Sequence, residues 1–165
     1  MTSNVEALTE KIEKSDQLWV GDKLWRGEET TIRQFPDYLS DARFFRMPKT
    51  FGYNKNTVLT ASACPLSIVY IAWKGKDGFT GLNDENPSQD WVKASGSIYY
   101  DRKEHKGREI LRKMEKTDPE LGNIWQRTFG ASETVMVLPS PTGNKSPFDI
   151  KVAIFIVEPQ PTSLN

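Results

Sequence analysis

Two long apolar runs dominate the pattern of hydrophobic and polar positions along the chain. Residues 66–73 read Leu-Ser-Ile-Val-Tyr-Ile-Ala-Trp, and residues 149–157 read Asp-Ile-Lys-Val-Ala-Ile-Phe-Ile-Val. Both have the length of a β-strand, are rich in β-branched and aromatic side chains, and are bounded by turn formers. In the second run apolar side chains occupy both alternating faces, which is typical of a strand covered on both sides. We predict that the two runs are central strands of a β-sandwich.

Shorter apolar segments between Gly, Pro, Asn and Ser positions predict further strands. They fall at residues 17–26, 30–35, 42–47, 57–63, 91–93, 97–100, 123–129 and 133–138. The pattern lacks the alternation of strands and helices that a parallel sheet requires. The predicted fold is therefore all-β: a two-layer antiparallel β-sandwich resembling a jelly roll.

The first residues have helical spacing. Ser3 and Glu6 are placed as in a capping box, in which each side chain caps the backbone of the other. Apolar side chains recur on one helical stripe, which consists of Val5, Leu8 and Ile12. We predict a short helix in a leader that spans residues 1–16, with this stripe packed on the sandwich or on a partner; the alternative is a solvated leader with one apolar face.

A second helical pattern interrupts the strands at residues 101–119. The stretch is dense in charges of both signs, and Pro119 should end it. Its apolar stripe consists of Ile110, Leu111 and Met114. We predict a helical insertion with a solvated face within a sandwich domain of residues 17–158, followed by a polar tail at 159–165.

Composition narrows the classes of partner. Lys plus Arg (22) equals Asp plus Glu (22), so no net positive field attracts nucleic acid or an anionic membrane surface. No apolar run approaches the roughly 20 residues of a membrane span. The first residues lack the basic and apolar regions of a secretory signal, and there is one cysteine. We expect a single cytoplasmic domain without disulfides.

Few reactive groups are available. One histidine, His105, and one cysteine, Cys64, cannot build a Cys/His zinc site within the chain, and no glycine-rich phosphate loop is present. Residues 74–89 form a long polar loop, and four acids lie in it or directly after it: Asp77, Asp84, Glu85 and Asp90. We predict that the loop is solvated; the alternative is that these acids bind a calcium ion between residues 77 and 90. We expect no other cofactor.

The tryptophans have two interpretations, because an indole ring fills a sandwich core or stacks on a sugar. We assign Trp19 and Trp125 to the core. Trp73 and Trp91 flank the long loop, so they are either core residues or the rim of a ligand site. In the second case Asp77 and Asn83 would supply hydrogen bonds to the ligand.

Several segments together resemble the galactose-binding-like β-sandwich modules that accompany polysaccharide lyases and other carbohydrate-active enzymes. The matching segments are Leu24-Trp25-Arg26, Pro36-Asp37-Tyr38-Leu39, Ile68–Trp73, Trp91, Ile124–Phe129 and Val152–Val157. Lys74 departs from the resemblance, since the modules often have an acid there. The resemblance implies a sandwich fold and a carbohydrate site.

The sequence suggests three alternative functions. The first is a non-catalytic binding or assembly module that contacts proteins through the 74–91 loop, the 101–119 insertion or one of the apolar stripes. The second is a carbohydrate-binding module, as the resemblance implies. The third is a lyase or hydrolase that uses carboxylates or tyrosine, which would require two carboxylates to converge in a cleft. We expect the first, and no enzyme activity.

Overall fold

The computed structural model describes residues 3–7, 12–25, 30–47, 58–74, 79, 82, 90–101, 120–140 and 152–159. Within these ranges the protein is all-β, with three antiparallel sheets and a single short 3₁₀ helix, η1 (Asp37–Leu39). No helix in the described part of the chain is long and apolar enough to cross a membrane.

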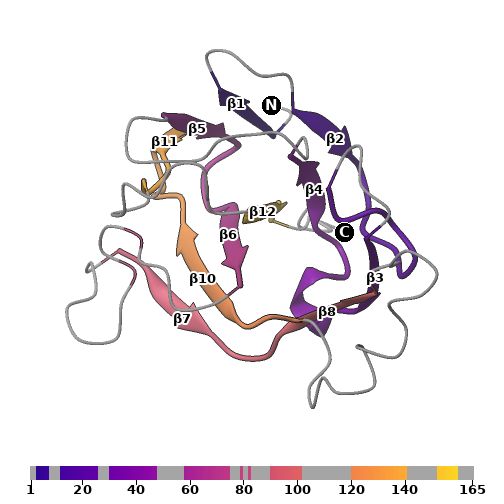
Figure 1. Ribbon diagram of the computed structural model, residues 1–165. Helices are drawn as coiled ribbons and strands as arrows, with labels where there is room; N and C mark the ends of the chain where they lie inside the picture. Colours follow the sequence, from indigo (N-terminus) through magenta and orange to yellow (C-terminus); the bar gives the residue numbers. More distant parts are fainter. Residues whose placement is uncertain are drawn as a thin grey trace, which may run out of the picture.

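The three sheets are shown in Figure 1. The first has the order β1–β5–β11, with strands β1 (Asn4–Ala7), β5 (Leu59–Ser62) and β11 (Val135–Val137). The second has the order β2–β4–β12–β6–β10–β7, with strands β2 (Glu13–Ser15), β4 (Arg43–Arg46), β12 (Val152–Val157), β6 (Ile68–Trp73), β10 (Asn123–Thr128) and β7 (Val92–Ala94). The third has the order β3–β8–β9, with strands β3 (Thr31–Gln34), β8 (Ile98–Asp101) and β9 (Glu120–Leu121).

The two apolar runs form the centre of the six-stranded sheet, as predicted. β12 pairs with β6 over six residues, from Val152 opposite Trp73 to Val157 opposite Ile68. Strand β4 lies on the other side of β12, and β10 on the other side of β6 (Figure 1). Each central strand thus has its backbone paired along both edges.

Both faces of these central strands are buried, which explains why their sequences are apolar at consecutive positions. Partners in an antiparallel ladder share a face. On one face, Phe155 stacks on Phe44 with ring centroids 4.9 Å apart, and Tyr70 stacks on Tyr38 from η1 at 5.0 Å. The opposite face carries the fully buried side chains of Phe45, Ile71 and Ile154, together with Trp125, which the sequence correctly assigned to the core.

The predicted N-terminal helix is wrong, because residues 4–7 are strand β1. Val5 pairs with Ala61 of β5 and is buried, while Asn4 and Glu6 on either side of it point outward. This is the period of a strand. A helix of one or two turns is marginal in water, whereas pairing with β5 satisfies the backbone and buries the valine.

Two other predicted elements were the strand at residues 17–26 and the helical insertion at residues 101–119. Residues 17–26 form no named strand where they are described; they contain a turn and an isolated bridge between Lys23 and Thr31. Most of the predicted helical insertion, residues 102–119, lies outside the described residues. The strands on either side of it, β8 and β9, are antiparallel neighbours, with Ile98 opposite Leu121. The insertion therefore connects adjacent strands of one sheet.

Candidate functional site

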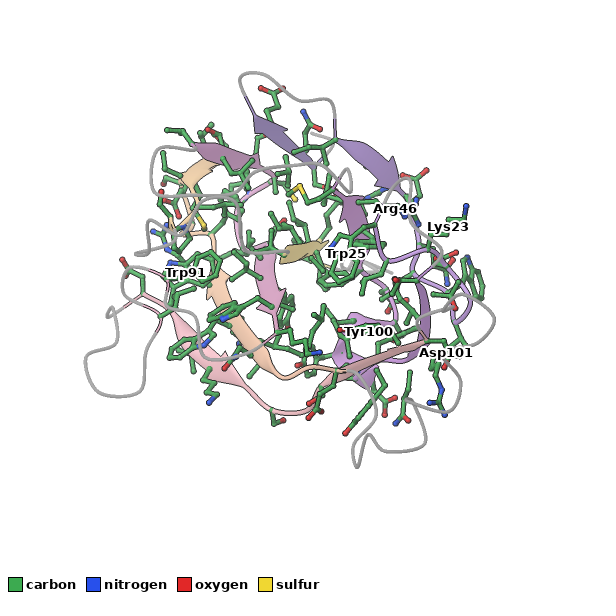
Figure 2. The ribbon with its side chains drawn as sticks, in the orientation of Figure 1. Lys23, Trp25, Arg46, Trp91, Tyr100 and Asp101 are labelled. Carbon is green, nitrogen blue, oxygen red and sulfur yellow. The ribbon has the colours of Figure 1, made fainter. Side chains whose placement is uncertain are left out.

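The two tryptophans proposed for a ligand rim lie in the core. Trp73 is 2% exposed and packs against Phe79, with ring centroids 4.4 Å apart. Trp91 is 7% exposed, and it lies on the other side of the molecule from Lys23 and Arg46 (Figure 2). Their ring faces are covered by protein, so neither can stack on a ligand in this conformation. Asp77 and Asn83, their proposed hydrogen-bonding neighbours, lie outside the described residues.

The helix that would carry the predicted N-terminal stripe does not form, and the two described members of the stripe lie against the core, which is one of the two placements that we predicted for it. Val5 is buried beneath the first sheet, and Ile12 is half-buried against the core, whereas Leu8 lies outside the described residues. The other stripe, which consists of Ile110, Leu111 and Met114, also lies outside the part that the structure describes.

The metal prediction concerns residues that are largely outside the described part. Of the four acids of the long loop, Asp90 alone is described, and it is exposed. Among the described side chains, no cluster of three or more His, Cys, Asp or Glu residues could hold a metal ion.

The structure exposes a different tryptophan, Trp19, which the sequence wrongly assigned to the core. Its side chain is 60% exposed, and that of the next residue, Val20, is 64% exposed. Both stand on a four-residue turn of residues 19–22. The Asp22 amide donates to the Trp19 carbonyl (3.1 Å), and the Trp19 amide donates to Asp22 Oδ2 (2.8 Å). Gly21 has φ +97°, a conformation that suits glycine in a turn.

Backbone hydrogen bonds fix this turn to the third sheet. The Gly21 amide donates to the Ile32 carbonyl (2.7 Å), and the Ile32 amide donates to the Asp22 carbonyl (2.8 Å). The Leu24 amide donates to the carbonyl of Thr30 (2.9 Å). Residues 21–24 therefore lie as a short extension beside β3.

Two side chains, Arg46 of the six-stranded sheet and Trp25 of the segment itself, attach the residues after the turn to the neighbouring strands. Arg46, which is buried, donates from Nε to the Lys23 carbonyl at 2.6 Å, and its guanidinium lies 5.1 Å from the centre of the Phe44 ring. Trp25 donates from Nε1 to the Val152 carbonyl at 3.1 Å and meets Tyr100 edge-on at 5.9 Å. Figure 2 shows Lys23 beside Arg46, with Trp25 extending toward β12. The base of the turn is thus anchored to β4, β8 and β12.

The chemistry of this Trp19 turn (residues 19–22) is that of a contact site. The indole ring presents an apolar face, and the structure gives its N–H no hydrogen-bond partner among the described residues. The side chain of Lys23 is also exposed and adds a positive charge close to the turn in sequence. A flat ring with a donor and a nearby cation suits either a pocket on another protein or the face of a sugar.

A Gly-Asp pair such as Gly21-Asp22 is typical of a turn, but the direction in which this turn presents Trp19 depends on distant residues. The sequence pattern places Trp19 within the strand predicted for residues 17–26, next to the apolar residues Leu18 and Val20. What decides its exposure is the attachment of residues 21–25 to Ile32, Arg46 and Val152, which are remote in sequence.

A second aromatic pair carries a perturbed ionisation. Tyr38 stacks on Tyr70 and donates from its hydroxyl to the Ser95 carbonyl at 2.7 Å. Burial, with a smaller contribution from Tyr70, raises the pKa of Tyr38 to about 12, and burial also raises the pKa of Tyr70. Both tyrosine hydroxyls therefore keep their protons near neutral pH and cannot act as bases. What the pair contributes is packing between η1 and β6.

Comparison with known proteins places the fold. No family model matches the chain, and no curated protein matches it. Among solved structures, the chain is similar to a β-glucuronidase from glycoside hydrolase family 2, with a TM-score of 0.61 and 12% sequence identity. The match covers 93% of this chain but 14% of that chain. At this identity the likeness shows the fold alone, which is all-β.

Proposed function

We propose that the protein is a non-catalytic β-sandwich module, jelly-roll-like in its layers, that binds another protein through the Trp19 turn. The observation that carries the proposal is the exposure of Trp19 and Val20 on a turn that is anchored to both adjoining sheets. Tryptophan is among the residues most enriched where protein interfaces concentrate their binding energy.

The anchoring of the turn supports this role energetically. Binding by a loose loop must first order that loop, and this lowers the net affinity. Here the backbone of residues 21–24 is already hydrogen-bonded to β3, and Arg46 and Trp25 hold its base. The indole can therefore be buried by a partner with little loss of backbone entropy.

The fold comparison is consistent with a module rather than with a whole enzyme. The similar β-glucuronidase is about seven times longer than the region that matches, as the 14% coverage implies. A unit of this size in such a protein can work by packing on or positioning other parts. For this chain that role remains our proposal.

The test compares two exposed positions of the full chain. Immobilised wild-type protein is incubated with lysate of its own source, and the bound proteins are quantified by mass spectrometry. Trp19→Ala should reduce capture of a specific partner by more than about tenfold, as loss of an interface anchor does. Val92→Ala is the matched control, because Val92 is 60% exposed on β7. Equal capture by wild type and Trp19→Ala would refute the proposal.

A carbohydrate-binding module is the second candidate, because an exposed indole and a neighbouring lysine also suit an acidic sugar. The likeness to a β-glucuronidase makes oligosaccharides that contain glucuronic acid the first ligands to try. Trp19 is the exposed tryptophan, the other four being buried, so a sugar stacked on it should protect the fluorescence from acrylamide quenching. Unchanged quenching with acidic and neutral polysaccharides would reject this candidate.

A further inference from the structure

One strand edge differs from all the others in the described sheets. The end strands of the three sheets are β1 and β11, β2 and β7, and β3 and β9. Five of them carry charged residues, among them Glu6, Lys14, Lys93, Arg33 and Glu120. Strand β11 reads Val135-Met136-Val137 and carries none. Charged residues on edge strands are a common protection against pairing with another chain, and β11 lacks that protection.

The outer backbone groups of this edge strand have no partner strand among the described residues. The Ala63 amide donates to the Thr134 carbonyl, and the Leu138 amide donates to the Leu59 carbonyl. Hydrogen-bonded pairs alternate with non-hydrogen-bonded pairs in an antiparallel ladder, so Met136 also faces β5 with its backbone groups. The amides and carbonyls of Val135 and Val137 therefore point away from β5. No described strand pairs with them.

The side chains beside this edge are uncharged as well. Val135 and Val137 are 57% and 65% exposed on the outer face of the sheet, opposite Ser62 and Thr60 of β5. Met136 points the other way and is buried. An outer face of β-branched and hydroxyl side chains can pack beside a copy of itself without bringing like charges together.

We propose that β11 pairs with β11 of a second copy of this chain, in an antiparallel arrangement about a twofold axis at Met136. Val135 of one copy then lies opposite Val137 of the other, and the two pairs exchange four backbone hydrogen bonds. Such a contact is isologous, because the same patch serves both partners. It joins the two three-stranded sheets into one sheet with the order β1–β5–β11–β11–β5–β1.

The absence of charge at this edge favours a second copy of the chain as the partner. Since the strand is uncharged and the chain has a formal net charge of zero, neither local nor long-range repulsion opposes self-association. The same three residues, Val135, Met136 and Val137, also form the contact in both copies, so the twofold register needs no other sequence. This surface is separate from the Trp19 turn, so the inference does not rest on the proposed function.

The test is sedimentation of the full chain over a roughly hundredfold range of concentration, because a dimer held by three-residue strands depends on protein concentration. The weight-average mass of the wild type should rise from that of one chain toward that of two. Val137→Lys, a charge at the free edge, should weaken this association at least about tenfold. Val92→Lys, on the edge strand β7 of another sheet, and Val137→Thr, uncharged and β-branched, should leave it unchanged.

A second readout serves if Val137→Lys folds poorly. Hydrogen exchange of the wild-type Val135 and Val137 amides should slow as the protein concentration rises, while exchange at Val92 should not change. A wild type that stays monomeric throughout overturns the inference, and so does a dimer that Val137→Lys leaves intact. Retained partner binding by Val137→Lys at the Trp19 turn would separate the two surfaces.

Discussion

Strands β12 and β11 have similar apolar sequences and opposite environments. β12 has a paired neighbour along both edges and five buried side chains out of six, whereas β11 is an end strand with one buried side chain out of three. An apolar run thus predicts a strand, but its place in the sheet decides what the apolar side chains do. In the centre they supply stability through burial; at the edge they remain available for contact.

The largest effect should separate these two strands directly. Ile154→Ala removes a fully buried side chain at the centre of β12 and should lower the free energy of unfolding by about 2–5 kcal/mol, through lost burial and a cavity. Val137→Ala should change it by less than about 0.5 kcal/mol in dilute solution. Denaturant unfolding of both variants measures the difference. Equal losses would mean that β11 is as much a part of the core as β12.

The next effect tests whether the segment that carries Trp19 is anchored to the central strand. Trp25→Phe removes the donor to the Val152 carbonyl and leaves that buried acceptor without its partner, so it should cost about 1–3 kcal/mol. Trp19→Ala should cost less than about 0.5 kcal/mol, because an exposed ring contributes little to folding. Thermal or denaturant unfolding compares the two. A larger loss for Trp19→Ala would place Trp19 in the core after all.

The third effect concerns the aromatic pair beside the central strand and depends on pH. Tyr38→Phe removes the hydrogen bond to the Ser95 carbonyl and should cost about 0.5–1.5 kcal/mol at neutral pH. The raised pKa of Tyr38 means that above pH 10 the unfolded chain releases a proton that the folded protein keeps. Wild-type stability should therefore fall as the pH rises from about 10 to about 12. Tyr38→Phe should lose less over that range, and an equal decline in both proteins would contradict the assignment.

Much of the strand pattern was predictable because the apolar runs are local signals. Residues 66–73 and 149–157 contain the two central strands, and turn formers marked most of the others. The N-terminal strand was not predictable in this way. Its capping-box spacing is genuine in the sequence, but pairing of Val5 with Ala61, more than fifty residues later, overrides a weak local preference.

The candidate site was missed for the same physical reason. Trp19 lies between two apolar residues, Leu18 and Val20, and Trp73 ends an apolar run, yet Trp19 is exposed and Trp73 is buried. The difference comes from Arg46, Ile32 and Val152, which attach the Trp19 segment from three separate strands. Such long-range attachments leave no periodic signal, so composition and spacing could identify the residue type but not its exposure.

The smallest expected change in unfolding free energy concerns the turn of residues 64–67, which precedes central strand β6. The Ser67 amide donates to the Cys64 carbonyl at 3.2 Å, and Pro65 fixes the first central position, so Leu66 occupies the second. Leu66 has φ +69° and is exposed, a combination in which a side chain gains no burial and strains the backbone.

Leu66→Gly should relieve that strain, although glycine also loses more backbone entropy on folding. The two contributions partly cancel, and the net gain in unfolding free energy should be about 0.5–1 kcal/mol, with Leu66→Ala giving no gain. Denaturant unfolding of the three proteins measures this small difference. A loss of stability in Leu66→Gly would show that the leucine contributes packing, and the exposed end of β6 would then belong with the buried centre rather than with the open edge.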